Sequence, residues 1–280
     1  MPTLTVATVQ FAETWSPPGN LRQILKYIES AGPNADVVHF HEGALSGYLA
    51  HTRSISLDHV DWQAIQNAME QIRQAARRVG TWVVVGSAHP LTPPHLPHNC
   101  LYLISPDGEI EDRYDKRFLT PADVRVFSPG DHDVIFTING IKCALLICYE
   151  VRFPELYRRL CAKGVQMIFQ SFHNAHAQGP SVHEKIMRQT MQAHAGMNYF
   201  WASACNSSAY YSSYPSVFIT PDGAIKMSLP RNKSGVMINT VDTSQEFYDA
   251  SGPYRQIAID GATHNSTLVT DPRSSNRHLL

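Results

Sequence analysis

The chain has 280 residues, of which 43% are hydrophobic and 17% charged, and its formal net charge is −1. This composition supplies enough apolar side chains for a large core and excludes a disordered chain. Scattered lysines and arginines exclude a basic face for nucleic acid, and no apolar run approaches the roughly 20 residues of a membrane helix, so we expect a small-molecule partner.

The first half of the chain alternates strand and helix patterns. β-Branched and apolar runs predict strands, a 3.6-residue apolar period predicts helices, and the turn Pro106-Asp107-Gly108 predicts a hairpin. Such alternation is typical of an α/β protein. The predicted elements are the strands Thr3–Phe11, Asp36–His41, Trp82–Gly86, Leu101–Ser105 and Glu109–Tyr114, and the helices Leu21–Ala31 and Trp62–Arg78.

The second half repeats this alternation and then changes character. The predicted elements are the strands Val134–Ile138, Ile141–Ile147, Val165–Gln170, Tyr199–Ala204, Ser216–Thr220, Ala224–Ser228 and Gly235–Thr240, and the helices Phe153–Lys163 and His183–Met197. No Gly/Ser-rich linker divides them, so we predict one domain over residues 1–242. From about Thr243 the periodicity fades. Residues 243–280 are therefore predicted to be an extension that packs on the domain or on a partner subunit.

The five cysteines are an odd number and lack the spacing of a small disulfide-bonded domain. We expect free thiols, of which one or two take part in chemistry. Together with the absence of an N-terminal signal pattern, this predicts a cytoplasmic protein.

Three reactive side chains each follow an apolar strand. Glu42 follows Val37-Val38-His39-Phe40-His41, Lys116 follows Arg113-Tyr114-Asp115, and Cys148 follows Ala144-Leu145-Leu146-Ile147. Ligand crevices of open α/β sheets form at such strand ends. Cys148 also precedes a predicted helix, whose N-terminus would favour a thiolate and an oxyanion. Taken singly, Glu42 and Lys116 could each be a solvated charge, and Cys148 could be a buried thiol without a function.

Taken together, these segments resemble the nitrilase superfamily of carbon–nitrogen hydrolases. The resemblance runs from about Thr3 to Asp242, with the segments in the family's order and approximate spacing. The matching segments are Glu42-Gly43-x-x-x-Gly47-Tyr48, Tyr114-Asp115-Lys116, Ser128-Pro129-Gly130-Asp131, Cys148-Tyr149-Glu150-Val151-Arg152-Phe153-Pro154-Glu155, Asn198-Tyr199-Phe200 and Ala204-Cys205-Asn206.

The resemblance implies a four-layer α-β-β-α sandwich, at least a homodimer, and no cofactor or metal. It also implies a mechanism in which Cys148 is the nucleophile and Glu42 the general base. Lys116 and the backbone N–H of Tyr149 would stabilise the oxyanion. The expected reaction is hydrolysis of a small amide or N-carbamoyl compound through a cysteine thioester. A nitrile substrate is the alternative within the family, which the Cys-Tyr-Glu-Val-Arg-Phe-Pro-Glu stretch disfavours because true nitrilases more often carry Cys-Trp-Glu.

The sequence also departs from the family. A second glutamate usually stands eight residues before the aspartate of the Pro-Gly-Asp motif, and the corresponding residue here is Asp123. We predict that Asp123 is the supporting carboxylate beside Lys116. Glu150 replaces the usual aspartate, and the residues around 170–174 differ from those of better-known amidases. The predicted pocket residues are Tyr48, Glu150, Phe172, His173 and Asn174.

Two alternatives remain from the sequence alone. A metallohydrolase could use the imidazoles of His173, His176 and His183, with Glu184 and His194 nearby in the chain, although His183 and His194 lack the i, i+4 spacing of a helical zinc site. A non-catalytic binding module could have kept the fold after losing the enzyme. The presence of all three reactive residues argues against the second alternative.

Overall fold

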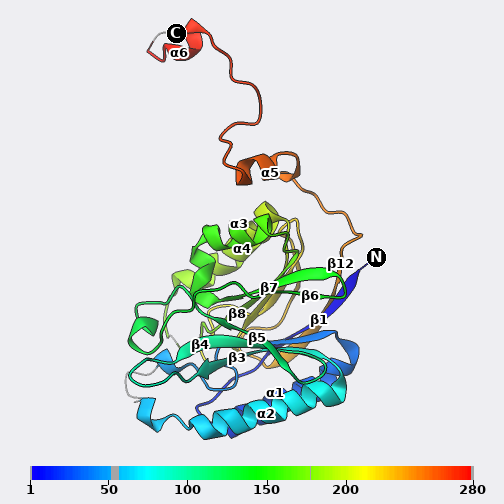
Figure 1. The fold of residues 1–280 in the computed structure, drawn as a ribbon, viewed down its shortest axis with the longest axis vertical. Coiled ribbons are helices and arrows are strands. Elements are labelled where there is room, and N and C mark those ends of the chain that lie inside the picture. The colour runs from blue at the N-terminus through cyan, green and yellow to red at the C-terminus, as the bar shows by residue number, and fades with distance from the viewer. Residues whose placement is uncertain (1, 52–56, 177, 279–280) are drawn as a thin grey trace.

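Two six-stranded sheets pack face to face, and helices cover both outer faces (Figure 1). This arrangement comes from a computed structural model that describes residues 2–51, 57–176 and 178–278. The four layers follow the order α-β-β-α, so the predicted sandwich is confirmed.

The first sheet has the strand order β12-β1-β2-β3-β4-β5, with β1, β2 and β3 parallel. Its strands are β1 Thr3–Gln10, β2 Val37–Phe40, β3 Trp82–His89, β4 His98–Ile104, β5 Ile110–Asp115 and β12 Gly235–Asp242. Helices α1 (Pro17–Ala31) and α2 (Trp62–Val79) cover its outer face (Figure 1). Helix α1 begins before the predicted Leu21, because Ser16 caps it and two prolines fit its first turn.

The second sheet has the order β11-β10-β9-β8-β7-β6, with β7, β8 and β9 parallel. Its strands are β6 Ile135–Ile138, β7 Ile141–Ile147, β8 Met167–Phe172, β9 Trp201–Asn206, β10 Val217–Ile219 and β11 Ile225–Ser228. Helices α3 (Pro154–Ala162) and α4 (Val182–Asn198) cover its outer face (Figure 1). Strand β9 begins two residues later than predicted, because Tyr199 caps α4 in the left-handed conformation, with φ of 59°.

Side chains that alternate along each strand of the first sheet enter two different cores. Val37 packs between the sheets, whereas its neighbour Val38 packs against α1 and α2. Hydroxyl and imidazole groups also join the sheets. His39 lies 2.8 Å from the hydroxyls of both Ser171 and Ser203, so the register between the sheets is fixed by hydrogen bonds as well as by packing. This register brings the carboxyl ends of β2 and β8 together.

The C-terminal extension leaves the sandwich after β12. It forms α5 (Gly252–Ile259) and α6 (Pro272–Ser275), and Figure 1 shows the chain between them running away from the sandwich. The aromatic ring of Phe247 still packs on Trp201, with centroids 5.0 Å apart, whereas residues 260–278 are exposed. The remaining short 3-10 turns are Gly32–Asn34, Leu49–His51, Leu57–His59, Asp123–Arg125 and Cys148–Arg152.

Candidate active site

Glu42 stands just past the end of β2 and is fully buried. The chain turns here against the neighbouring strand β3, whose Gly86 leaves the necessary space. A Cβ on Gly86 would lie 2.2 Å from the carbonyl oxygen of His41, so only glycine allows this approach. The turn therefore fixes the Glu42 carboxylate in the interior.

Lys116 stands just past the end of β5 and is also fully buried. Its Nζ lies 2.8 Å from Glu42 Oε1 and 2.8 Å from Asp123 Oδ2. Burial alone would lower the pKa of Lys116, but the charge of Glu42 and of neighbouring groups outweighs it and holds the pKa well above its ordinary value. Lys116 is therefore a buried cation between two carboxylates.

Asp123 begins a 3-10 turn and is buried beside this cation. Its Oδ1 accepts a hydrogen bond of 2.6 Å from the Tyr48 hydroxyl, and its Oδ2 accepts one of 3.0 Å from the backbone N–H of Thr120. Burial opposes ionisation, yet Lys116 and these hydrogen bonds lower the pKa of Asp123. The shorter carboxylate thus reaches Lys116 directly.

Cys148 follows β7 with a φ of 43° and is 8% exposed. A non-glycine residue in this region is strained, and such strain is concentrated at functional sites. Asn174 Nδ2 lies 3.4 Å from its Sγ. Burial and then the charge of Glu42 raise the pKa of the Cys148 thiol, while Lys116 opposes them. The thiol and the two charged groups are therefore electrostatically coupled.

The helix predicted at Phe153–Lys163 after Cys148 is present as α3 (Pro154–Ala162). The 3-10 turn Cys148–Arg152 stands between the strand and α3, which starts only at Pro154. Pro154 opens α3 as expected for a first helical residue, and the influence of this helix N-terminus on the thiol stays a prediction. Tyr149 is the second residue of the turn, and the part of its backbone N–H in catalysis stays a prediction.

Glu150 and Phe172 make contacts typical of the protein framework. Glu150 is fully buried, with Oε2 accepting from the Ile147 N–H at 2.7 Å and Oε1 accepting from the Tyr114 hydroxyl and the Arg117 N–H at 2.7 and 2.8 Å. Phe172 is a core side chain whose ring lies edge-on to Tyr214. Neither geometry supports the predicted place of these two residues in the substrate pocket.

His173 and Asn174 follow β8 and reach the two sides of the site. The His173 imidazole stacks on the Tyr48 ring, with centroids 4.6 Å apart. Asn174 Nδ2 contacts the cysteine sulfur and donates a 2.8 Å hydrogen bond to the Tyr214 hydroxyl. The segment after β8 therefore touches both the nucleophile and the tyrosine that binds Asp123.

Two residues that hydrogen-bond to the predicted site residues were not predicted from the sequence. Asn99 Nδ2 donates a 2.7 Å hydrogen bond to Glu42 Oε1, the same oxygen that binds Lys116. Tyr214 supports Asn174 from a loop. Asn99 lies within β4 rather than past a strand end, and Tyr214 belongs to an aromatic and serine-rich stretch, so neither stood out.

The residues that could bind zinc differ from those predicted from the sequence. Among the described residues, the cluster of metal-ligand types is Glu13, His173 and His176, whose ligand atoms all lie within 4.8 Å of one another. His183 lies against Arg152, at 3.3 Å, and His194 stacks on Tyr157. The proposed participation of His183 and His194 was therefore wrong, and Glu13 was missed.

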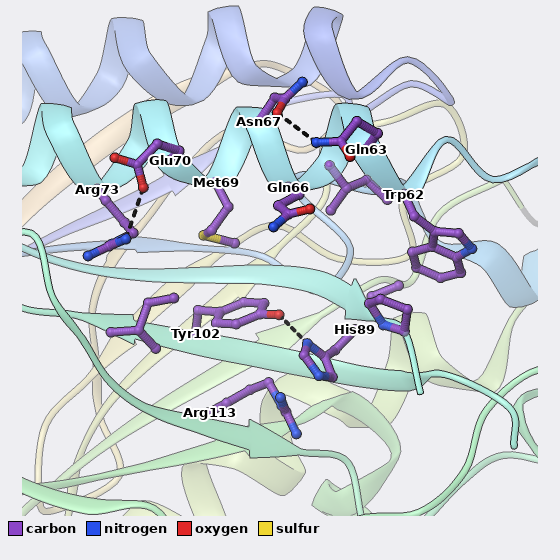
Figure 2. Close-up of a pocket in the computed structure, with 14 residues that line it drawn as sticks. Trp62, Gln63, Gln66, Asn67, Met69, Glu70, Arg73, His89, Tyr102 and Arg113 are labelled. Carbon is purple, nitrogen blue, oxygen red and sulfur yellow. Dashed lines mark hydrogen bonds and ion pairs between the residues drawn. The ribbon is translucent and has the colours of Figure 1, made fainter. Parts of the chain in front are cut away.

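A cavity of about 740 Å³ lies apart from these residues, between α2 and strands β3 to β5. Figure 2 shows Tyr102 hydrogen-bonded to His89 on its sheet side, with Trp62 and Met69 on the helix side. Its lining includes none of the predicted site residues. This cavity is therefore separate from the predicted catalytic residues.

The family model described as "Carbon-nitrogen hydrolase" matches residues 5–247. The chain belongs to the carbon–nitrogen hydrolase family. It is 28% identical over 206 residues to a 2-oxoglutaramate amidase of Bacillus subtilis, covering 72% of this chain and 75% of the relative. It is 29% identical over 187 residues to an (R)-stereoselective amidase of a Pseudomonas species, covering 67% of this chain and 64% of that relative.

Solved structures of this superfamily share the fold. An amidase from Nesterenkonia sp. AN1 with acrylamide added to its active-site cysteine superposes with a TM-score of 0.77 at 22% identity, covering 92% of this chain and 98% of that one. The same amidase after removal of its tag gives a TM-score of 0.75 at 23% identity, covering 86% and 94%. This carbon–nitrogen hydrolase therefore has the nitrilase-superfamily sandwich.

Proposed function

We propose that this carbon–nitrogen hydrolase cleaves small amides or N-carbamoyl compounds through a thioester on Cys148. The observation that carries the proposal is the buried contact of Lys116 Nζ with both Glu42 Oε1 and Asp123 Oδ2 at 2.8 Å, beside a strained cysteine. A cation, a base and a thiol in one buried site are the groups that acyl transfer needs. Relatives named as amidases support the amide class.

Glu42 is proposed as the proton carrier in both half-reactions. Its Oε1 is occupied by Asn99 and Lys116, whereas its Oε2 makes no hydrogen bond within the described residues. As the Cys148 sulfur forms its bond to the carbonyl carbon, Oε2 would take the thiol proton and then pass it to the departing ammonia or amine. In the second half-reaction it would take a proton from the water that attacks the thioester.

Lys116 is proposed to stabilise the oxyanion. Its raised pKa keeps it charged throughout the cycle, and its position between two carboxylates fixes its direction. The carbonyl π bond opens to an oxyanion when sulfur attacks and re-forms when the C–N bond breaks, so a fixed cation favours the intermediate over the ground state. The backbone N–H of Tyr149 is the proposed second donor.

A substrate panel tests this function. Small primary amides, N-carbamoyl amines and nitriles should be compared for ammonia release, with carbon dioxide measured for the N-carbamoyl series. We expect turnover of amides or N-carbamoyl compounds ahead of nitriles, and mass spectrometry of a quenched reaction should find the acyl group on Cys148. Acylation at another residue, or turnover of nitriles alone, would contradict the proposal.

We also propose a homodimer or larger homo-oligomer in which the extension 243–280 covers a neighbour. The support is that Tyr248, Leu268 and Val269 are 80%, 70% and 77% exposed, which is unusual for apolar side chains with nothing to bind. Light scattering of the full chain and of a chain ending at residue 259 tests this. The full chain should be oligomeric and the shortened chain should have a smaller mass.

A cytoplasmic location completes the proposal. All five cysteines are free thiols in the structure, which fits a reducing compartment. None of the helices in the described ranges combines the length and hydrophobicity that crossing a bilayer requires. Fractionation of cells that express the chain, with thiol labelling of each fraction, tests the location.

A further inference from the structure

A buried carboxylate and three imidazoles meet where the carboxyl ends of three strands converge. Glu13 comes shortly after β1, His41 directly after β2, and His173 directly after β8. Strands β1 and β2 are parallel neighbours in one sheet, and β8 belongs to the facing sheet. His176 approaches from the segment that follows His173. The hydrolytic mechanism uses none of these four side chains.

Three of these residues lie at distances that suit a ligand shell, since the ligand atoms of Glu13, His173 and His176 all lie within 4.8 Å of one another, and His41 approaches Glu13 from its other oxygen. Glu13 Oε1 lies 2.6 Å from His173 Nε2 and 3.4 Å from His176 Nε2, and Glu13 Oε2 lies 3.7 Å from His41 Nε2. Zinc bonds of about 2.0–2.1 Å in a tetrahedron separate neighbouring ligand atoms by roughly 3.3 Å. The His176 distance is close to that value, and the His173 contact would widen by less than about 1 Å. His41 meets the second Glu13 oxygen, so its Nε2 would have to move toward the ion to join the shell.

His41 supplies an independent sign of a missing ligand. Its side chain is fully buried, and its Nδ1 lies 3.0 Å from the Glu42 carbonyl oxygen, which can only accept a hydrogen bond. In the neutral ring Nδ1 therefore carries the proton and Nε2 presents a lone pair. Within the described residues Nε2 has no hydrogen-bond partner. It faces Glu13 Oε2, so two acceptors oppose each other in the interior.

The surroundings resemble the outer shell of a metal site. Ligating histidines commonly donate their second N–H to a backbone carbonyl, as His41 does to Glu42, and ligating carboxylates are themselves hydrogen-bonded. The Ser207 hydroxyl donates such a bond to Glu13 Oε2. Three imidazoles with one carboxylate are a donor set suited to zinc and similar divalent ions.

We propose that Glu13, His173 and His176 bind one Zn²⁺ ion and that His41, whose Nε2 lies 3.7 Å from the second Glu13 oxygen, moves in as the fourth ligand. Four protein ligands complete a tetrahedral shell, so the ion is structural and leaves no position for a hydrolytic water. The ion holds the segment from His173 to His176, which carries Asn174 against the Cys148 sulfur. The ion thus fixes the position of Asn174 beside Cys148 and takes no part in the hydrolysis.

The test measures metal content and affinity as well as activity. The full chain, purified without a metal-affinity column, is analysed for bound metals by mass spectrometry, then stripped with a chelator and titrated with Zn²⁺ in a calorimeter. We expect one zinc per chain, a higher melting temperature with zinc than without, and the visible absorption of a tetrahedral site when Co²⁺ replaces it. Substoichiometric zinc together with no cobalt spectrum would overturn the proposal.

Two histidine variants locate the ion. His176→Ala removes a ligand whose side chain is 31% exposed, so the fold should tolerate it, and we expect at least about 10-fold weaker zinc affinity and no thermal stabilisation by zinc. His183→Ala is the matched control, because His183 lies outside the cluster beside Arg152. Its affinity should equal that of the wild type. Equal affinity in His176→Ala and the wild type, or an equal loss in both variants, would place the ion elsewhere.

Discussion

Glu42 and Glu150 are both fully buried carboxylates that sit near strand ends and interact electrostatically with Lys116, yet their hydrogen bonds differ. Both oxygens of Glu150 accept hydrogen bonds from the Ile147 N–H, the Tyr114 hydroxyl and the Arg117 N–H. Glu42 uses one oxygen for Asn99 and Lys116, and the other has no partner among the described residues. If Glu42 is the base, as proposed, burial does not distinguish it from Glu150, whereas its unused capacity to accept a hydrogen bond does.

The largest loss of turnover is expected from a substitution of the proposed nucleophile, Cys148. Cys148→Ala removes the atom that forms the thioester, so turnover should fall by at least about 10,000-fold while the protein stays folded. Ammonia release and circular dichroism check this. Cys161→Ala, at a half-buried thiol on α3, is the control and should stay active. An active Cys148→Ala would refute the assignment.

Lys116→Ala tests the cation that both acids face. The substitution removes a charge that stabilises the oxyanion and opposes the rise in thiol pKa, so turnover should fall by about 100- to 1000-fold and alkylation of Cys148 should slow. Ammonia release and iodoacetamide labelling at pH 8 measure the two effects. If both quantities stay at wild-type values, Lys116 does not act at the thiol.

Asp123→Asn weakens one of the two carboxylate contacts of Lys116. The amide keeps the shape of the side chain but removes the negative charge that Lys116 Nζ meets at 2.8 Å. We expect turnover to fall by about 10-fold, the size of one charge-assisted hydrogen bond, with little change in melting temperature. A lower melting temperature with unchanged turnover would make Asp123 a framework residue like Glu150.

Glu150→Gln should have the smallest effect on catalysis. An amide nitrogen would face N–H or O–H donors where a carboxylate oxygen now accepts, so we expect a loss of about 1–3 kcal/mol in the free energy of unfolding. Chemical denaturation measures this loss. Turnover should change by less than the effect of Asp123→Asn, and a larger loss of turnover without destabilisation would assign Glu150 a direct role.

Apolar periodicity predicted most of the strands and helices because it reports burial directly, whereas the four-layer sandwich was predicted from the resemblance to the nitrilase superfamily. The strand-end positions drew attention to Glu42, Lys116 and Cys148, and the resemblance to the family assigned their predicted roles. Glu13 satisfies the same criterion after β1 and was overlooked. Asn99 could not be found this way, because its contact with Glu42 depends on how β4 lies in the folded sheet. The hydrogen bonds of Glu150 to the Ile147 N–H and its other donors could not be foreseen either, because they depend on the tertiary structure.

The ends of the helices and strands were also predicted only in part from the sequence. The start of α1 at Pro17 follows from local capping, whereas the 3-10 turn at Cys148 and the left-handed Tyr199 depend on tertiary packing that local propensity does not encode. The extension was predicted without regular structure and contains α5 and α6. Local signals therefore located the elements and the start of α1, whereas packing decided the other two boundaries.

The pH dependence of Cys148 alkylation in Glu42→Gln tests the central claim most directly, because thiolate formation and turnover should move in opposite directions. The charge of Glu42 raises the thiol pKa, so its removal should lower that pKa and shift the alkylation profile to lower pH. Ammonia release by the same variant should fall by at least about 100-fold, because the proton carrier is gone. Glu150→Gln should leave the alkylation profile in place. An unmoved profile in Glu42→Gln, or turnover close to wild type, would contradict the assignment of Glu42 as the base that acts on Cys148.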